Sequence, residues 1–206
     1  MARSVHTGRG DLESLANESV STVRGEIDGL TRLVNSFSEV ARMPDPELAP
    51  NRLHETWERA VSPFSDQMQL REEGLRQLPE LRYDDDQIRR SFHNLARNAL
   101  EAGAGRLDLV ASQTAERIQL ELVDDGPGIP AEDLPLVFEP YYTRNENGTG
   151  QGLAIVYTHN VDHGWRVHVS SADEHGGTGP RVTIDIPVRS TAEEESSNAR
   201  CAPGQR

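Results

Sequence analysis

Lysine is absent from the sequence: all 21 basic residues among its 206 are arginine. This absence excludes a P-loop lysine, a Schiff-base lysine and a Ser-Lys catalytic dyad. Acidic side chains number 34, so the formal net charge is −13. The phosphate backbone of a nucleic acid repels a chain of this charge, and we expect no nucleic-acid partner.

Cysteine, aromatic residues and long hydrophobic runs are also scarce. The single cysteine, Cys201, excludes an internal disulfide framework and favours a reducing compartment, so we expect a cytoplasmic location. No run approaches the roughly 18 consecutive apolar residues of a membrane span, and the N-terminus has no apolar signal core. We therefore expect no membrane segment in this chain.

An apolar repeat predicts a long helix over residues 11–42. Its spacing alternates between three and four residues, which is typical of a helix that packs along one stripe. Gly25 and Gly29 weaken this helix by about 1 kcal/mol each, and the Met43–Pro46 segment ends it. The pattern fits a helix on a domain core and a coiled-coil-like dimerisation helix equally well. The apolar positions are Val20, Val23, Ile27, Leu30, Val34, Phe37 and Ala41.

Hydrophobic periodicity in the rest of the chain predicts an α+β fold, a two-layer α/β sandwich with helices on one face of a mostly antiparallel sheet. Polar composition predicts disorder over residues 1–10 and 190–206, which leaves 11–46 as the long helix and 47–189 as the globular domain. We expect helices over about 51–62 (with Asn51 as N-cap), 85–102 and 153–162, strands near 69–75, 107–109, 118–122, 167–169 and 182–186, and a loop-rich insert over 124–152.

Two asparagines give the helix over 85–102 a polar face. Asn94 and Asn98 are four residues apart and therefore lie one above the other, with Glu101 beside them. Neutral amide oxygens suit a Mg²⁺ ion whose charge is balanced mainly by substrate phosphates. A solvated helix face is the alternative interpretation of the asparagines alone.

Two glycine-containing segments carry the other chemical signals. DDGPGI, after the strand near 118–122, offers a carboxylate at Asp124 that can accept a hydrogen bond from the exocyclic amine of adenine, beside glycines that admit a planar ligand. GTGQGL opens the helix over 153–162, where bare backbone amides and the helix dipole form an anion site. Taken singly, the segments are also consistent with an acidic turn and a flexible linker.

The order of these segments resembles a known family. The chain is similar to the ATP-binding catalytic domain of sensor histidine kinases over residues 11–188, and the region after Leu30 is similar to the second helix of the dimerisation hairpin in nitrogen-regulation kinases of the NtrY/NtrB type. The segments that carry the resemblance are NLARNALEA, DDGPGI, FEPYY and GTGQGLAIV as the N, G1, F and G2 boxes, the closing HGGTGPRVTIDIP, and the upstream LTRLVNSFSEVARMPDPELAP.

The resemblance implies a histidine kinase/gyrase-type ATP-binding fold and an ATP site with Mg²⁺. It implies that Asn98 coordinates the Mg²⁺ bridging the ATP phosphates, that Asn94 supports it, and that Asp124 accepts from the adenine amine. It further implies an adenine pocket shaped by Gly126, Gly128 and Ile129 with Thr178 nearby, and a lid hinge and phosphate site formed by Gly148, Thr149, Gly150, Gly152 and Leu153, with Arg144 reaching the terminal phosphate.

The sequence also departs from the family pattern. Gln151 replaces the usual leucine of GTGLGL, Trp165 replaces a second glycine after Gly164, and Asn145 and Asn147 stand where the lid often carries basic residues. The acceptor-histidine box of the first hairpin helix is missing, so we expect the chain to begin after it. His93, which lies inside the nucleotide-binding helix, is expected to pack rather than to accept phosphate.

The resemblance implies the catalytic portion of a two-component kinase, which delivers the ATP γ-phosphoryl group to a histidine for relay to a response regulator receiver domain. It also implies a homodimer through residues 11–42 in the intact kinase, which upstream segments can anchor to a membrane. An ATP-binding interaction module without kinase activity is the alternative. The long N-terminal helix and FEPYY disfavour a serine-kinase anti-sigma factor. Asn94, where gyrase- and MutL-type ATPases place a glutamate base, disfavours that class.

Overall fold

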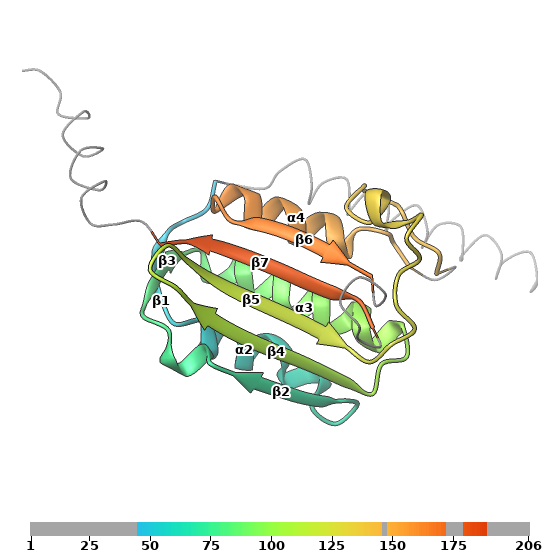
Figure 1. Ribbon diagram of the computed structural model, residues 1–206, viewed down its shortest axis with the longest axis horizontal. Coiled ribbons are helices and arrows are strands. Elements are labelled where there is room, and N and C mark those ends of the chain that lie inside the picture. The colour runs from blue at the N-terminus through green and yellow to red at the C-terminus, as the bar shows by residue number, and fades with distance from the viewer. Residues whose placement is uncertain (1–44, 146–147, 172–178, 189–206) are drawn as a thin grey trace, which may run out of the picture. The chain divides into compact units, whose positions relative to one another are not determined.

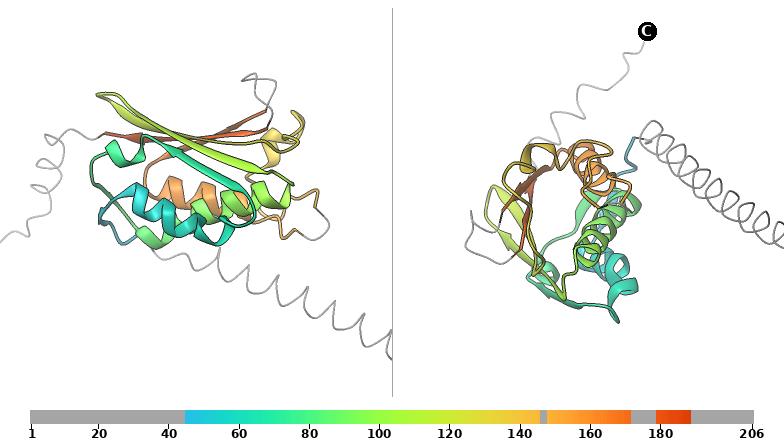
Figure 2. Two further views of the ribbon diagram at one scale, coloured as in Figure 1. Left: turned by 90° about the horizontal axis from the view of Figure 1, so that it is seen from below. Right: turned by 90° about the vertical axis from the view of Figure 1, so that its right-hand side faces the viewer.

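The structure, a computed structural model, describes residues 45–145, 148–171 and 179–188. These residues form two layers, a five-stranded sheet and a layer of α-helices that covers one of its faces (Figures 1 and 2). The expected α+β sandwich is therefore confirmed. The helix expected over 11–42 and the tail expected over 190–206 lie outside the described residues.

The order of the strands places the end of β5 near the middle of the sheet. The strands lie in the order β2 (Gln69–Glu73), β4 (Arg106–Gln113), β5 (Arg117–Asp124), β7 (Arg181–Pro187) and β6 (Arg166–Ser170). β2 and β4 are parallel because the chain between them crosses over through α3 (Asp85–Glu101), whereas the other neighbours are antiparallel, as expected.

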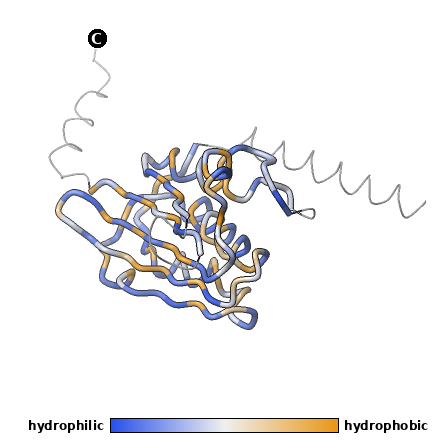
Figure 3. Tube along the Cα trace, turned by 45° about the vertical axis from the view of Figure 1, so that its right-hand side comes forward, coloured by the Kyte–Doolittle hydropathy of each residue, from blue (hydrophilic) through white to orange (hydrophobic). Residues whose placement is uncertain are grey.

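The core lies between the sheet and the helices α2 (Leu53–Val61), α3 and α4 (Gly152–Asp162). Alternation along β5 turns Ile118, Leu120 and Leu122 inward, and the tube coloured by hydropathy shows this alternation along the strands (Figure 3). On the helix side, Phe92 of α3 is fully buried and meets Trp57 of α2 edge to face, with ring centroids 5.4 Å apart.

Helix α3 begins and ends close to the residues that the pattern predicts. Asp84 is its N-cap, and its Oδ1 accepts a hydrogen bond from the Gln87 backbone amide at 3.0 Å. Two more acidic residues in the first turn complement the helix dipole. Gly103, with φ +85°, follows the C-cap Ala102 and ends the helix.

The prediction that Asn51 caps the first helix of the domain is wrong. Asn51 belongs to β1 (Ala49–Asn51), which pairs with β3 (Leu81–Tyr83) in a small second sheet that periodicity did not predict. Its Nδ2 donates to the carbonyl oxygens of Ala49 at 3.1 Å and Tyr83 at 2.9 Å, so the side chain ties the two strands together. Arg52 occupies the N-cap position instead, without a side-chain capping bond.

Short elements also shift some expected boundaries. β2 ends at Glu73 rather than near residue 75, because Gly74 has φ +88° and turns the chain; an added Cβ there would lie 2.3 Å from the Ala111 carbonyl oxygen. Three 3₁₀ turns complete the described residues, η1 (Ser62–Phe64), η2 (Leu75–Gln77) and η3 (Leu134–Leu136). None of the helices in the described ranges is long and apolar enough to cross a membrane.

Candidate functional site

The polar face of α3 meets the start of α4. Asn94 is buried and Asn98 is half-buried on this face. A Cβ added to Gly152, the first residue of α4, would lie 2.9 Å from Oδ1 and 3.2 Å from Nδ2 of Asn98. The Asn98 carboxamide therefore lies directly against the N-terminus of α4, and a side chain at residue 152 would displace it.

The turn after β5 packs on the other side of the same end of α3. A Cβ added to Gly126 would lie 3.7 Å from the Cβ atoms of Ala102 and Ala104, and the Ala102 amide donates to the Asn98 carbonyl at 3.0 Å. Gly179 also approaches closely, because its added Cβ would lie 2.0 Å from the Asp124 carbonyl oxygen. The Asp124 turn and the N-terminus of α4 thus both pack at the C-terminal end of α3, the helix that carries Asn98.

Asp124 is held in a largely desolvated position. Its Oδ1 accepts a hydrogen bond from the Gly126 amide at 2.8 Å. Burial raises the pKa of the Asp124 carboxyl; the Gly126 amide lowers it, and the charge of Asp125 adds to the rise. A partly buried carboxylate is suited to accept a hydrogen bond from a ligand, because burial weakens its stabilisation by water.

Asp125, the next residue, has a structural role. Its Oδ1 accepts from the backbone amides of Gly105 at 2.8 Å and Arg106 at 2.9 Å, which joins the start of β4 to the end of β5. The Arg106 and Gly105 amides hold the pKa of this exposed carboxyl below its ordinary value. Two adjacent aspartates therefore have different functions.

The loop that begins after η3 is closed at its base. The Tyr141 amide donates to the Gly150 carbonyl at 2.8 Å, and both residues have positive φ, +71° and +65°. A Cβ added to Gly150 would lie 2.4 Å from the Tyr141 carbonyl carbon, so the two backbones are in direct contact. Gly148 lies within this loop, and its amide donates to the Asn145 carbonyl at 2.9 Å.

Arg144, expected to reach a terminal phosphate, is bound to carboxylates in this structure. Its Nε lies 2.6 Å from Asp133 Oδ2 and its Nη2 lies 2.8 Å from Asp133 Oδ1 and 3.1 Å from Glu132 Oε1. Asp133 is only 5% exposed and also accepts from the Tyr142 hydroxyl at 2.6 Å. This network, which the sequence motifs did not indicate, fastens the loop to the segment before η3.

The remaining predicted site residues fall around this centre. Ile129 and Leu153 are partly buried against the core, Gly128 has φ +85° in the turn after Asp124, and Thr149 is exposed in the loop. Thr178 lies outside the described residues. Gln151, which sequence reasoning noted only as a departure, is buried at the N-cap of α4.

Three histidines within the domain, His93, His159 and His163, pack against neighbouring elements. As expected, His93 packs: its Nδ1 lies 3.3 Å from the Ala60 carbonyl oxygen and its ring lies 5.0 Å from that of Phe64. Burial lowers the pKa of His159. His163 accepts the Asp84 amide at its Nε2, and Trp165 packs on His163 at a ring distance of 5.4 Å.

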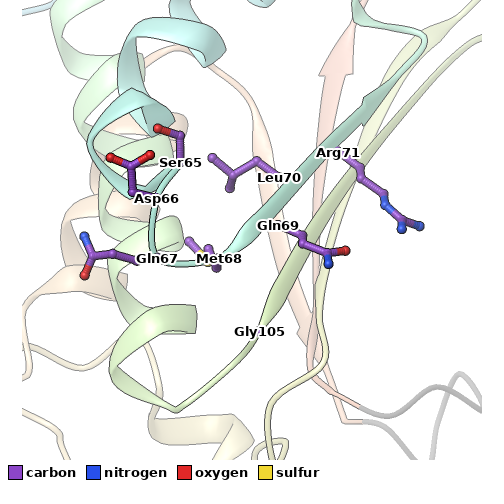
Figure 4. A pocket seen from close by; sticks show the side chains of 8 residues that line it. All are labelled: Ser65, Asp66, Gln67, Met68, Gln69, Leu70, Arg71 and Gly105. Carbon is purple, nitrogen blue, oxygen red and sulfur yellow. The ribbon is translucent and has the colours of Figure 1, made fainter.

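A shallow groove of about 630 Å³ lies elsewhere, along β2 and the loop before it. Figure 4 shows its lining, in which the Gln69 and Arg71 side chains point away from those of Ser65 and Asp66. None of the motif residues described above lines it. We therefore place the candidate site at the end of α3 rather than in this groove.

Comparison with known proteins assigns the chain to a family. The model of the histidine kinase-, DNA gyrase B- and HSP90-like ATPases matches residues 83–190, which is more than half of the chain and includes the four motifs. The chain belongs to this family. It contains the ATP-binding catalytic domain of a two-component sensor histidine kinase.

Three curated kinases show how the chain relates to longer proteins. It is 30% identical to the sensor histidine kinase ZraS of Escherichia coli O157:H7 over 186 residues, covering 87% of this chain and 40% of ZraS. It is 30% identical to the sensory histidine kinase/phosphatase NtrB of Rhodobacter capsulatus, covering 82% and 52%, and 28% identical to the nitrogen regulation protein NtrY of Azorhizobium caulinodans, covering 82% and 23%. The chain spans at most about half of these relatives.

Solved structures share the fold. A mycobacterial sensor histidine kinase, MprB, has a TM-score of 0.60 and 26% identity, covering 69% of this chain and 98% of that one. The histidine kinase ThkA, in complex with the response regulator protein TrrA, has a TM-score of 0.64 at 16% identity, covering 90% and 53%. The second likeness shows the fold alone.

Proposed function

We propose that the domain binds Mg·ATP at the C-terminal end of α3 and passes the γ-phosphoryl group to a histidine outside the described residues. The observation that carries this proposal is the contact between the Asn98 carboxamide and the first residue of α4. It joins a neutral oxygen ligand to a helix N-terminus, a pairing that suits a metal-bound phosphate.

The Asp124 turn would hold the adenine ring. The Asp124 carboxylate would accept a hydrogen bond from the exocyclic amine of adenine. Guanine carries a carbonyl oxygen at that position, and the carboxylate would repel this oxygen. Gly126, Gly128 and Ile129 would line the ring, with Thr178 nearby. The burial that raises the pKa of Asp124 supports this role, because a desolvated carboxylate gains more from a ligand donor than an exposed one.

The residues present fit a Mg²⁺ ion that the substrate brings with it. Within the described ranges, no group of three or more His, Cys, Asp or Glu side chains is arranged to hold a metal ion. An ion at Asn98, with Asn94 in support, would therefore take most of its ligands from phosphate oxygens and water, which is usual for Mg²⁺. When bound, it would neutralise the charge that develops on the phosphates.

The loop and the start of α4 would hold the phosphates. The backbone amides of Gly152 and Leu153 belong to the first turn of α4, where the dipole favours an anion. Gly148, Thr149 and Gly150 lie in the loop that would close over the phosphates. Arg144 can neutralise the terminal phosphate only by leaving Asp133 and Glu132. Loop closure and exchange of the Arg144 partners are therefore coupled in this proposal.

The chemical step would need positioning rather than a base. A neutral imidazole attacks phosphorus with its own lone pair, so no carboxylate has to remove a proton first. The side chain of Asn94 is an amide, which cannot act as the general base that an attacking water would need. Its presence is therefore consistent with transfer to a histidine. The phosphohistidine would then pass its phosphoryl group to a response regulator, a class of partner that ThkA binds in its solved complex.

We further propose that residues 11–42 form the dimerisation helix of the intact kinase, with 47–189 as the catalytic domain. The similarity to ZraS, NtrB and NtrY covers more of the chain than the family model alone. A second candidate function, an ATP-binding interaction module without kinase activity, is favoured by the binding of Arg144 to carboxylates rather than to the phosphate site.

The proposal predicts a specific preference for adenine nucleotides. Calorimetry with Mg²⁺ should show binding of a non-hydrolysable ATP analogue and much weaker binding of the GTP analogue. Asp124→Ala should weaken the ATP analogue by about 1–3 kcal/mol, because the adenine amine loses its acceptor in a desolvated site. Equal affinity for the two analogues, or an unaffected Asp124→Ala variant, would contradict the assignment.

A further inference from the structure

Gln151 is a buried polar side chain with an unused donor. It is the N-cap residue of α4 and only 5% exposed. Its Nε2 is covered, and no hydrogen-bond partner reaches this atom in the part of the chain that the structure describes. A buried amide without a partner is unfavourable, and leucine, the usual residue in the GTGLGL pattern, would occupy a similar volume without that cost.

The position of Gln151 indicates what its donor is for. Residue 150, on one side, packs on the Tyr141 backbone at the base of the loop, and residue 152, on the other, packs on the Asn98 carboxamide. The backbone of Gln151 is therefore held between a residue that packs on the loop and a residue that packs on the Mg²⁺-ligand candidate, at the N-terminus of an 11-residue helix. Among the site residues, this is the phosphate end rather than the adenine end, where Asp124 lies.

We infer that Gln151 is a phosphate ligand of the bound nucleotide, its Nε2 donating to an oxygen of the phosphates beside Asn98. This inference rests on the proposed function. A hydrogen bond from an amide to an anionic oxygen is stronger than one between neutral groups, so it compensates for the unused donor. Because Nε2 is covered here, the contact requires the groups around this atom to shift as the phosphates enter.

The test compares ligands that differ only in their phosphates. Adenosine, ADP and a non-hydrolysable ATP analogue are titrated with Mg²⁺ into the wild type and Gln151→Leu, with thermal unfolding of each protein measured without nucleotide. Gln113→Leu is the matched control, because Gln113 is exposed at the end of β4 that is opposite to the site. Gln151→Glu, which keeps the size of the side chain, replaces the donor by a group that repels phosphate.

We expect Gln151→Leu to lose roughly tenfold or more in affinity for ADP or the ATP analogue, as for a hydrogen bond to a charged group. Adenosine affinity should be unchanged, the melting temperature should be equal or higher, and Gln151→Glu should show a larger selective loss. Unchanged affinity for all ligands in both variants would overturn the inference. An equal loss for adenosine, ADP and the analogue would overturn it too, because the residue would then only maintain the pocket.

The two proposals fail in different ways. If the wild type binds neither ADP nor the ATP analogue, the proposed function is wrong, and the role of Gln151 falls with it. If the wild type binds both and the Gln151 variants match it, the proposed function stands and only the phosphate contact is wrong.

Discussion

Asp124 and Asp125 are neighbours in the chain, yet the fold shifts their pKa values in opposite directions. Burial raises the pKa of Asp124, so its ionisation opposes folding as the pH rises through the raised value. The Arg106 and Gly105 amides lower the pKa of Asp125, so its ionisation supports folding above the ordinary value of 3.8 and the support is lost as the pH falls through the lowered value. At neutral pH, the ionised Asp124 in the candidate ligand site therefore lowers the stability of the fold, whereas the ionised Asp125 at the junction of β4 and β5 raises it.

Substituting the two aspartates one at a time should give stability changes of opposite sign. At neutral pH, Asp124→Asn should raise the free energy of unfolding and Asp125→Asn should lower it. Both differences should shrink as the pH falls, because the carboxyls then become protonated in the wild type. Urea denaturation at a series of pH values measures this. Changes of the same sign, or a pH-independent difference for Asp124→Asn, would contradict the assigned environments.

At the scale of elements, how much of the fold the sequence predicts depends on the range of the interactions. Helix α3 was predicted within one residue because its apolar periodicity and its stop at Gly103 are local features. The strands β1 and β3 were missed because three-residue strands show no periodicity and depend on a partner some thirty residues away. The Asn51 error has the same cause, since its amide bonds to Tyr83 across that sheet.

The features of the candidate site also divide into those that local sequence motifs predict and those that depend on long-range packing. Asn98, Asp124 and Gly152 were proposed as site residues from motif order, and in the structure the α4 N-terminus and the Asp124 turn both pack at the end of α3. The partners of Arg144 were not predicted, because Asp133 lies in a loop with no recognisable pattern. The unused donor of Gln151 was also beyond prediction, because burial of a single side chain depends on packing from both sides.

The base of the loop gives a prediction at the element scale. Gly150→Ala forces an alanine to φ +65° and places its Cβ against the Tyr141 backbone. Such strain costs about 1–3 kcal/mol, and we expect the affinity for an ATP analogue to fall by a comparable free energy in calorimetry. Gly103→Ala is the control, because φ there is +85° but an added Cβ meets nothing within 4 Å. Equal effects of both substitutions would show that the Tyr141 contact is irrelevant.

The polar face of α3 gives a second prediction at this scale, on the rate of ATP hydrolysis. Asn94 is buried, and an amide cannot accept a proton from attacking water. Steady-state ATP hydrolysis by the domain should therefore be far slower than the roughly 1 s⁻¹ at the low end of ordinary enzyme turnover. A phosphate-release assay measures this, with Asn94→Glu expected to raise the rate where the new carboxylate fits. Turnover near 1 s⁻¹ in the wild type would contradict the role given to Asn94.

At the scale of the whole molecule, the sheet and the helix layer contribute different chemical groups to the candidate site at the end of α3. The sheet contributes the carboxylate at the end of β5, α3 contributes the amides, and α4 contributes an N-terminus that glycine lets approach Asn98. Among the described residues, none of the groups assigned to this point is a nucleophile, and we therefore propose that the domain positions ATP for a histidine outside these residues. The partition between catalytic domain and acceptor is the central claim.

One measurement tests that claim most directly. The 206-residue chain is incubated with Mg²⁺ and ATP labelled at the γ-phosphate, alone and with a separately produced dimerisation hairpin of NtrB that carries the acceptor histidine. We predict acid-labile, base-stable label on the hairpin, none on the chain alone, and loss of the label with Asp124→Ala. Label on the chain itself, or an unlabelled hairpin while the chain binds the ATP analogue, would contradict the account.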